Sequence, residues 1–137
     1  MRRYISLLLF LSVGFGQKEY NNNDLIEMDN GLTTVKFSDE PISGKVYGYY
    51  GEEKNPKKVY IGNIRNGEKE GKWVDYYHSS GKKNYEGNYK DGKQDGLHTW
   101  WYRNGQKNFE RTNKDGELVD IIGRWKEDGK EGAEGNN

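Results

Sequence analysis

The stretch YIGNIRNGEKEGKW at residues 60–73 decides the fold, because it returns 25 residues later as YEGNYKDGKQDGLH at residues 85–98. Both copies have the spacing Tyr-x-Gly-x4-Gly-x3-Gly, and a third, degenerate copy, FERTNKDGELVDII, follows at residues 109–122. A fixed period of this length is typical of repeat proteins, in which each unit stacks on the one before it. We assign structural roles to the repeat positions Tyr60, Gly62, Gly67, Gly71, Tyr76, Tyr85, Gly87, Gly92, Gly96, Trp101, Gly105, Gly116 and Trp125.

The repeat unit is predicted to be a β-hairpin. Tyr85, Gly87 and Tyr89 alternate with polar residues, which is the two-residue period of a strand with one covered face. Asp91-Gly92 follows as a tight-turn signal, since glycine readily adopts positive φ. Equivalent turns are expected at Asn66-Gly67, Ser80-Gly81, Asn104-Gly105 and Asp115-Gly116. The sequence therefore predicts an all-β protein in which consecutive antiparallel β-hairpin repeats form a single elongated twisted sheet.

Four segments are expected along the chain. Residues 1–16 have the pattern of a signal peptide: a basic start, an apolar run and a small-x-small site at Gly14-Phe15-Gly16. Residues 17–58 are predicted as a lead-in with a strand, a turn at residues 38–41 and a second strand. Residues 59–129 contain the hairpin repeats, and residues 130–137 are predicted as a flexible tail because they are rich in glycine and charge. The leader predicts a secreted, periplasmic or envelope location, and the absence of cysteine excludes a lipid-anchored cysteine after the leader.

Composition limits the partners. The chain has 22 basic and 22 acidic residues, and removal of the leader with Arg2 and Arg3 leaves 20 basic residues and a net charge of −2. Nucleic acid is therefore not expected as a partner, since binding to it needs a basic face. The chain has 4 Trp, 11 Tyr and 4 Phe residues but few aliphatic ones, a composition that fits a thin sheet covered by aromatic rings.

The spacing Tyr-x-Gly-x4-Gly-x3-Gly resembles the core of the membrane occupation and recognition nexus (MORN) repeat. The run GKWVDYY at residues 71–77 with Gly81-Lys82, and the segment FSDEPISGKV at residues 37–46, are similar to the MORN-2 type found in proteins labelled YwqK-type antitoxins. The third copy departs from the pattern, with Arg111 and Asp120 in place of two glycines. The resemblance implies a MORN-like sheet of hairpins that makes protein–protein or membrane-proximal contacts.

No catalytic or metal site is predicted, and no cofactor. His78 and His98 are the only histidines, and no cysteine is present to complete a zinc site. Ser79 and Ser80 adjoin His78, but Ser-Ser-Gly has the composition of a hairpin turn. We therefore expect a protein that is not an enzyme.

The aromatic side chains are the candidate binding residues. Strand parity places one set on one sheet face and Val74, Tyr76, Thr99 and Trp101 on the other. Tyr76 and Trp101 are expected to pack, because the same offset is aromatic again at Trp125. The exposed set, a candidate aromatic stripe, is then Trp73, Tyr77, Trp100 and Tyr102.

Three functions fit these patterns. The first is a secreted or envelope-associated, non-enzymatic interaction module with an unidentified protein partner. The second is a glycan- or cell-wall-binding repeat protein, since glucan-binding repeats also combine glycine with Trp and Tyr-Tyr. The third is an antitoxin or immunity protein. A glycan or a membrane surface is thus the alternative to a protein as partner.

Overall fold

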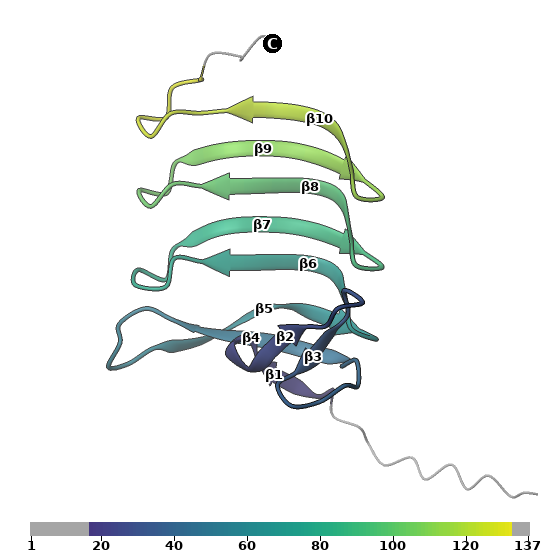
Figure 1. The fold of residues 1–137 in the computed structure, drawn as a ribbon. Helices are drawn as coiled ribbons and strands as arrows, with labels where there is room; N and C mark the ends of the chain where they lie inside the picture. The colour runs from purple at the N-terminus through teal and green to yellow at the C-terminus, as the bar shows by residue number, and fades with distance from the viewer. Residues whose placement is uncertain (1–16, 133–137) are drawn as a thin grey trace, which may run out of the picture.

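The computed structural model describes residues 17–132 as an open β-sheet whose strands follow one another like the rungs of a ladder (Figure 1). The predicted leader at residues 1–16 lies outside the described residues. Eight strands form the sheet in the order β1-β4-β5-β6-β7-β8-β9-β10, and the neighbours from β4 to β10 are antiparallel. The all-β class and the consecutive hairpins are therefore as predicted.

The strands of the large sheet are β1 (Glu19–Asn21), β4 (Gly44–Tyr50), β5 (Lys57–Arg65), β6 (Glu68–Tyr76), β7 (Lys83–Lys90), β8 (Lys93–Trp101), β9 (Lys107–Lys114) and β10 (Glu117–Arg124). A second sheet pairs β2 (Leu25–Glu27) with β3 (Thr33–Val35), and a 3-10 turn η1 (Asn22–Asp24) precedes β2.

The hairpin turns have the geometry that their sequences demand. Asp91 has a φ of 50° and Gly92 a φ of 76°, and the Asn66-Gly67 and Asp115-Gly116 pairs are closely similar. Positive φ at both central residues defines the type I′ turn, whose twist matches that of the flanking strands. The amide of the glycine in each of these three turns also donates to the hairpin or segment before it, as from Gly92 to the carbonyl of Lys69 (3.1 Å).

The last glycine of each complete motif has a positive φ, and Gly96 also lies in a bulge. Gly71 and Gly96 have φ values of 73° and 105°. At Gly96 the pairing of β7 with β8 shifts, so that β8 has more residues than its partner between paired positions. Asp120 occupies this position in β10, which shifts its register at two separate places instead. The third hairpin thus forms although its motif is degenerate, because two smaller bulges replace the one at glycine.

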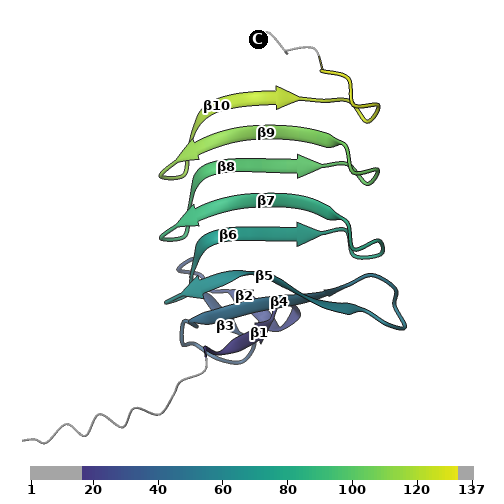
Figure 2. The same cartoon turned by 180° about the vertical axis from the view of Figure 1, so that it is seen from behind.

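The core lies at the first rungs, where the β2–β3 sheet lies over the large sheet (Figures 1 and 2). Val46 and Ile64 are almost fully buried, and Leu25 and Val35 of the small sheet pack against the core that they form. Figures 1 and 2 show no other described element over either face of β7–β10. The far rungs therefore form a single layer.

Two segment boundaries differ from the prediction. The boundary at residue 58 falls inside β5, which pairs with β4, so the lead-in and the repeats share one sheet. The strand-turn-strand expected around residues 38–41 is present as β3 and β4, and these two strands lie in different sheets because β3 pairs with β2.

The tail predicted from residue 130 is wrong for residues 130–132. Trp125 pairs with Glu131, and the amide of Gly132 donates to the carbonyl of Arg124 (2.7 Å). The equivalent pairs are Trp101 with Lys107 and, around a turn that is one residue longer, Tyr76 with Lys83. After β10 the chain therefore turns back, and residues 130–132 pair with the end of β10, as the starts of β7 and β9 pair with the ends of β6 and β8.

Candidate binding surface

An aromatic row crosses one face of the sheet from β7 to β9, and we define it as Tyr89, His98, Tyr85, Trp100 and Phe109. Adjacent rings lie within contact distance: 5.6 Å for Tyr89–His98, 5.9 Å for His98–Tyr85, 5.1 Å for Tyr85–Trp100 and 5.4 Å for Trp100–Phe109, between centroids. Such ring pairs stabilise a sheet beyond the area that they bury. Contacts between these rings thus pack β7, β8 and β9 against one another, in the part of the sheet that has no second layer.

His98 is the fully buried centre of the row. Its Nδ1 lies 2.8 Å from the Tyr85 hydroxyl, which in turn lies 2.9 Å from the Tyr89 hydroxyl. Burial, together with the positive charge of Arg111, outweighs a backbone hydrogen bond and lowers the pKa of His98. Burial, reinforced by the hydrogen bond with Tyr89, raises the pKa of Tyr85. Both side chains are therefore neutral near pH 7, which suits a packed row.

Cationic side chains lie over the row. The guanidinium of Arg111 is 5.2 Å from the ring of Trp100, and that of Arg124 is 4.4 Å from the ring of Phe109. These contacts are attractive because the face of an aromatic ring carries partial negative charge. Arg111 occupies the position of the motif glycine in the earlier copies, so the degenerate repeat supplies a cation to the row.

Trp73 is part of the core and not of an exposed stripe, which corrects the prediction. It is 6% exposed, and its indole N–H donates to the carbonyl of Asn63 (3.1 Å). The ring lies over Gly62, where any Cβ atom would collide with it. The first glycine of the motif is therefore required by this close approach.

Tyr77 and Tyr102 join successive rungs. Tyr77 donates its hydroxyl hydrogen to the carbonyl of Trp101 (2.6 Å), and Tyr102 does the same to Trp125 (2.8 Å). Both are partly buried. Of the four residues in the predicted stripe, only Trp100 belongs to the aromatic row, while Tyr77 and Tyr102 hold the loop ends of the rungs together.

Strand parity placed Trp101 on the opposite face from Trp100, and its contacts lie on that face. The ammonium group of Lys83, which pairs with Glu86 there, lies 5.3 Å from the Trp101 ring. Trp100, Trp101 and Tyr77 all take part in lining one hollow of about 400 Å³. The pairing of β8 with β9 shifts between Trp100 and Trp101, and that of β6 with β7 shifts between Asp75 and Tyr76, which packs against Tyr50 with ring centroids 5.1 Å apart. Thr99 also lies on the face of Trp101, where it donates to Glu110 (2.8 Å).

The hollow combines rings with polar groups. Asn84 and Asn108, the extra residues at the β7 and β9 register shifts, line it together with Tyr85 and the carboxylate of Asp75. The Oδ1 atom of Asn84 is buried and accepts no hydrogen bond within the described part of the chain. A buried acceptor without a partner is costly, and this atom is closed to a ligand in the hollow as well as to solvent.

The opposite face holds ion pairs. Glu86 lies 3.1 Å from Lys72 and close to Lys83, and Glu110 lies 2.7 Å from Lys107. The hydrogen bond from Lys83 lowers the pKa of Glu86. Burial acts to raise the pKa of Glu110, but the hydrogen bonds from Lys107 and Thr99 outweigh it and the pKa is lowered. This face is thus neutralised by its own charges.

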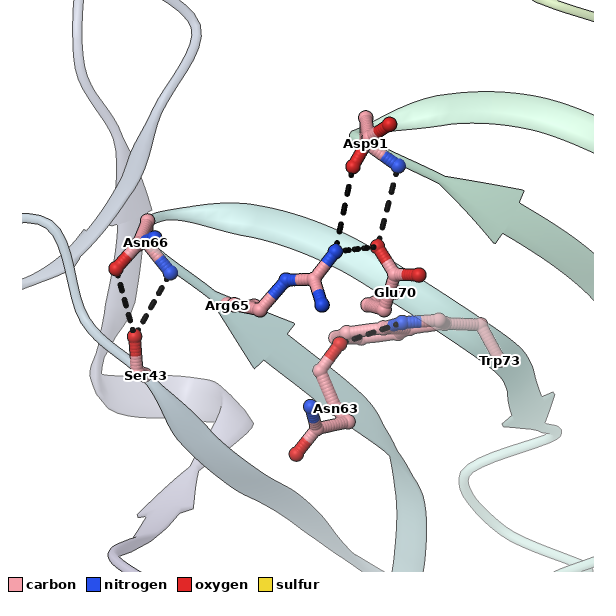
Figure 3. A network of polar contacts seen from close by, with 7 residues as sticks. All are labelled: Ser43, Asn63, Arg65, Asn66, Glu70, Trp73 and Asp91. Carbon is pink, nitrogen blue, oxygen red and sulfur yellow. Dashed lines mark hydrogen bonds and ion pairs between the residues drawn. The ribbon is translucent and has the colours of Figure 1, made fainter.

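A polar network supports the turn end of the first rungs (Figure 3). Glu70 accepts from the backbone amide of Asp91 (3.2 Å) and from Arg65 (3.3 Å), and Arg65 also lies 3.3 Å from the Asp91 carboxylate. One rung earlier, Ser43 accepts from the amide of Asn66 (2.7 Å). These contacts fix each turn to the strand before it and give the cluster a structural role.

Among residues 17–132 there is no group of three or more His, Cys, Asp or Glu side chains placed to hold a metal ion. Within the same residues, no helix has the length and apolar character needed to span a bilayer. His78 and His98 lie in different surroundings, since His78 is exposed and close to Tyr50.

Comparison of the chain with protein-family models, with curated proteins and with solved structures gave no match in any of the three.

Proposed function

We propose that this protein is a non-enzymatic interaction module of the secreted or envelope-associated kind, and that the face with the aromatic row is its contact surface. The observation that carries the proposal is the single layer beyond β6, where half-buried rings lie on a face that no described element covers. Aromatic residues and arginine are the side chains most enriched in binding surfaces.

The two faces differ in a way that favours this one. The opposite face pairs its carboxylates with lysines of its own strands, through Glu86 and Glu110. On the aromatic face, the guanidinium of Arg111 lies over Trp100, and its one side-chain hydrogen bond within residues 17–132 is to the amide oxygen of Gln94 (2.9 Å). Rings and uncompensated guanidinium groups together suit contact with a partner.

The MORN-type motif supports the same conclusion, since the resemblance implies contact rather than catalysis. The envelope location rests on the leader sequence at residues 1–16.

Affinity capture tests the proposal. Immobilised protein is exposed to envelope extract, and bound material is identified by mass spectrometry for the wild type and for a Trp100→Ala/Arg111→Ala variant. The control is Val74→Ala, which changes the opposite face of β6. We expect the double variant to lose its captured partner while its circular dichroism spectrum is kept, and Val74→Ala to retain the partner. Equal capture by all three proteins would refute the proposal.

A further inference from the structure

We propose that the face with the aromatic row binds a short acidic segment of a partner protein, laid across the strands in an extended form. This inference rests on the proposed function, because it names the chemistry of the partner at the same face. The observation that carries it is a difference in charge: the cations over the rings of this face have no carboxylate partner within residues 17–132, whereas the carboxylates of the same strands are paired elsewhere.

Three cations lie over rings of the row, and we call them the cationic set: Lys69 of β6, Arg111 of β9 and Arg124 of β10. The ammonium group of Lys69 is 5.2 Å from the ring of Tyr89, and the two guanidinium groups lie over Trp100 and Phe109 as described above. A ring face attracts a cation but leaves N–H donors free to bond to a carboxylate. Each cation is thus held over the sheet with donors left for a partner.

The carboxylates of this part of the sheet do not neutralise the cationic set. The strands β7, β8 and β9 contain one carboxylate each, which are Glu86, Asp95 and Glu110 in that order. Every one of them pairs with a lysine outside the cationic set. Within residues 17–132, no carboxylate lies within ion-pair distance of the cationic set. The face therefore has an excess of positive charge that an acidic partner would complement.

Apolar groups lie beside the cations. The rings of Trp100 and Phe109 are half-buried. Ile121 of β10, which is 43% exposed, is opposite Arg111 in the register and so lies on the same face. Leu118, 53% exposed, is likewise opposite a β9 residue of this face, Asn113. A peptide whose apolar side chains alternate with carboxylates would use both kinds of group, which a small inorganic anion would not.

A long polyanion fits this face less well than a short segment. Exposed carboxylates of Asp91, Asp115 and Glu117 lie at the turn end of the same rungs. A nucleic acid or an anionic bilayer extends beyond the cationic set and would meet them. The set spans the sheet from β6 to β10, which is about 19 Å at the usual spacing between strands. About six residues of extended chain cover that distance.

Fluorescence anisotropy of labelled heptapeptides tests the inference with the purified protein. The acidic peptide EFDYELE is compared with its uncharged analogue QFNYQLQ and its basic analogue KFKYKLK. We expect saturable binding of the acidic peptide alone. Arg111→Gln and Arg124→Gln should each weaken it about tenfold, because each variant loses a charge-assisted hydrogen bond.

The matched control is Lys93→Gln, which removes one exposed positive charge from β8. Lys93 precedes Gln94, the residue that accepts from Arg111, so strand alternation places it on the opposite face. The control should bind EFDYELE like the wild type, which separates a local contact from the net charge of the protein. Arg124 is exposed, so Arg124→Gln should keep its melting temperature and remains informative if Arg111→Gln weakens the fold.

The inference is overturned if EFDYELE does not bind, if QFNYQLQ binds equally well, or if both arginine variants bind like the wild type. Vesicles of phosphatidylcholine and phosphatidylserine in equal parts form a further arm, and binding to them but not to the peptide would make a lipid surface the occupant instead. If neither binds but capture of an envelope protein still depends on Trp100 and Arg111, the acidic-segment inference fails and the proposed function stands. If capture is also independent of those residues, both fail.

Discussion

The hydroxyl of Tyr77 donates to the backbone carbonyl of Trp101, which lies 24 residues further along the chain (2.6 Å). Tyr102 and Trp125 repeat the contact in the next rung (2.8 Å). At the other end of the rungs, the turn glycines donate their amides to the preceding strand. Each rung is therefore held to its neighbour at both ends as well as by the ladder between them.

Replacing Tyr77 with Phe should destabilise the protein by about 1 kcal/mol, because it removes one hydrogen bond and keeps the ring. Urea unfolding followed by tryptophan fluorescence measures the change. Tyr102→Phe should behave alike, since its contact is equivalent. An unchanged midpoint in both variants would show that water replaces the phenol without loss.

Gly92→Val should cost about 1–3 kcal/mol, since a β-branched residue resists the left-handed φ of 76° that Gly92 adopts. Gly92→Asn is the control, because asparagine tolerates this region better than other residues. Thermal melts of the three proteins should rank wild type, Asn and Val in falling order. Equal melting temperatures for Val and wild type would contradict the turn geometry.

Trp73→Ala should cost about 3–5 kcal/mol, as for other buried tryptophans. This reverses the expectation from strand parity, which made Trp73 an exposed binding residue. Trp125→Ala, at a partly buried position, should cost less. The comparison uses the free energy of unfolding from urea titration, and a smaller cost at Trp73 than at Trp125 would contradict the core assignment.

Stability should fall as the pH drops below about 4.5, the ordinary pKa of a glutamate carboxyl. The pKa values of Glu86 and Glu110 are lowered in the folded protein, so the unfolded chain takes up protons first. Their contribution is complete above the unfolded pKa and is lost as the pH falls through the folded one. Glu110→Gln should therefore reduce the difference between the melting temperatures at pH 6 and pH 3.5. If the melting-temperature difference between pH 6 and pH 3.5 is the same in Glu110→Gln as in the wild type, Glu110 does not contribute to the loss of stability in acid.

Residues 1–16 should be removed on export, which N-terminal sequencing or intact mass of protein expressed in a bacterial host would show. Recovery of the chain with Met1 in a soluble cytoplasmic fraction would remove the case for an envelope location and favour the antitoxin alternative.

The local signals in the sequence were sufficient for the hairpins. Asp91-Gly92, Asn66-Gly67 and Asp115-Gly116 specify type I′ turns through backbone sterics alone, and the alternation around Tyr85 specifies strands. These features depend on neighbouring residues, so the sequence pattern contains them. The partners of β3 could not be predicted in this way, because pairing with β2 or with β4 depends on how the lead-in folds over Ile64 and Trp73.

The candidate site was predicted less well, because parity gives the face of a side chain but not what covers that face. Trp73 belongs to the core against which Leu25 and Val35 of the small sheet pack, and only a known tertiary arrangement shows this. The extra residues at the register shifts, Asn84 and Asn108, lie in β7 and β9 and leave the alternation along β6 and β8 unchanged. The repeated asparagine before each motif aromatic, Asn84 and Asn108, was the signal in the sequence that could have located these shifts.

The order of the rungs has a mechanical consequence. The first and last described residues belong to opposite ends of the ladder (Figure 1). Tension applied through the two termini therefore acts across the strands rather than along them. In that direction the hydrogen bonds of one rung bear the load before those of the next. A protein held by its ends would thus peel open one hairpin at a time at low force, and would lengthen gradually instead of breaking in a single event.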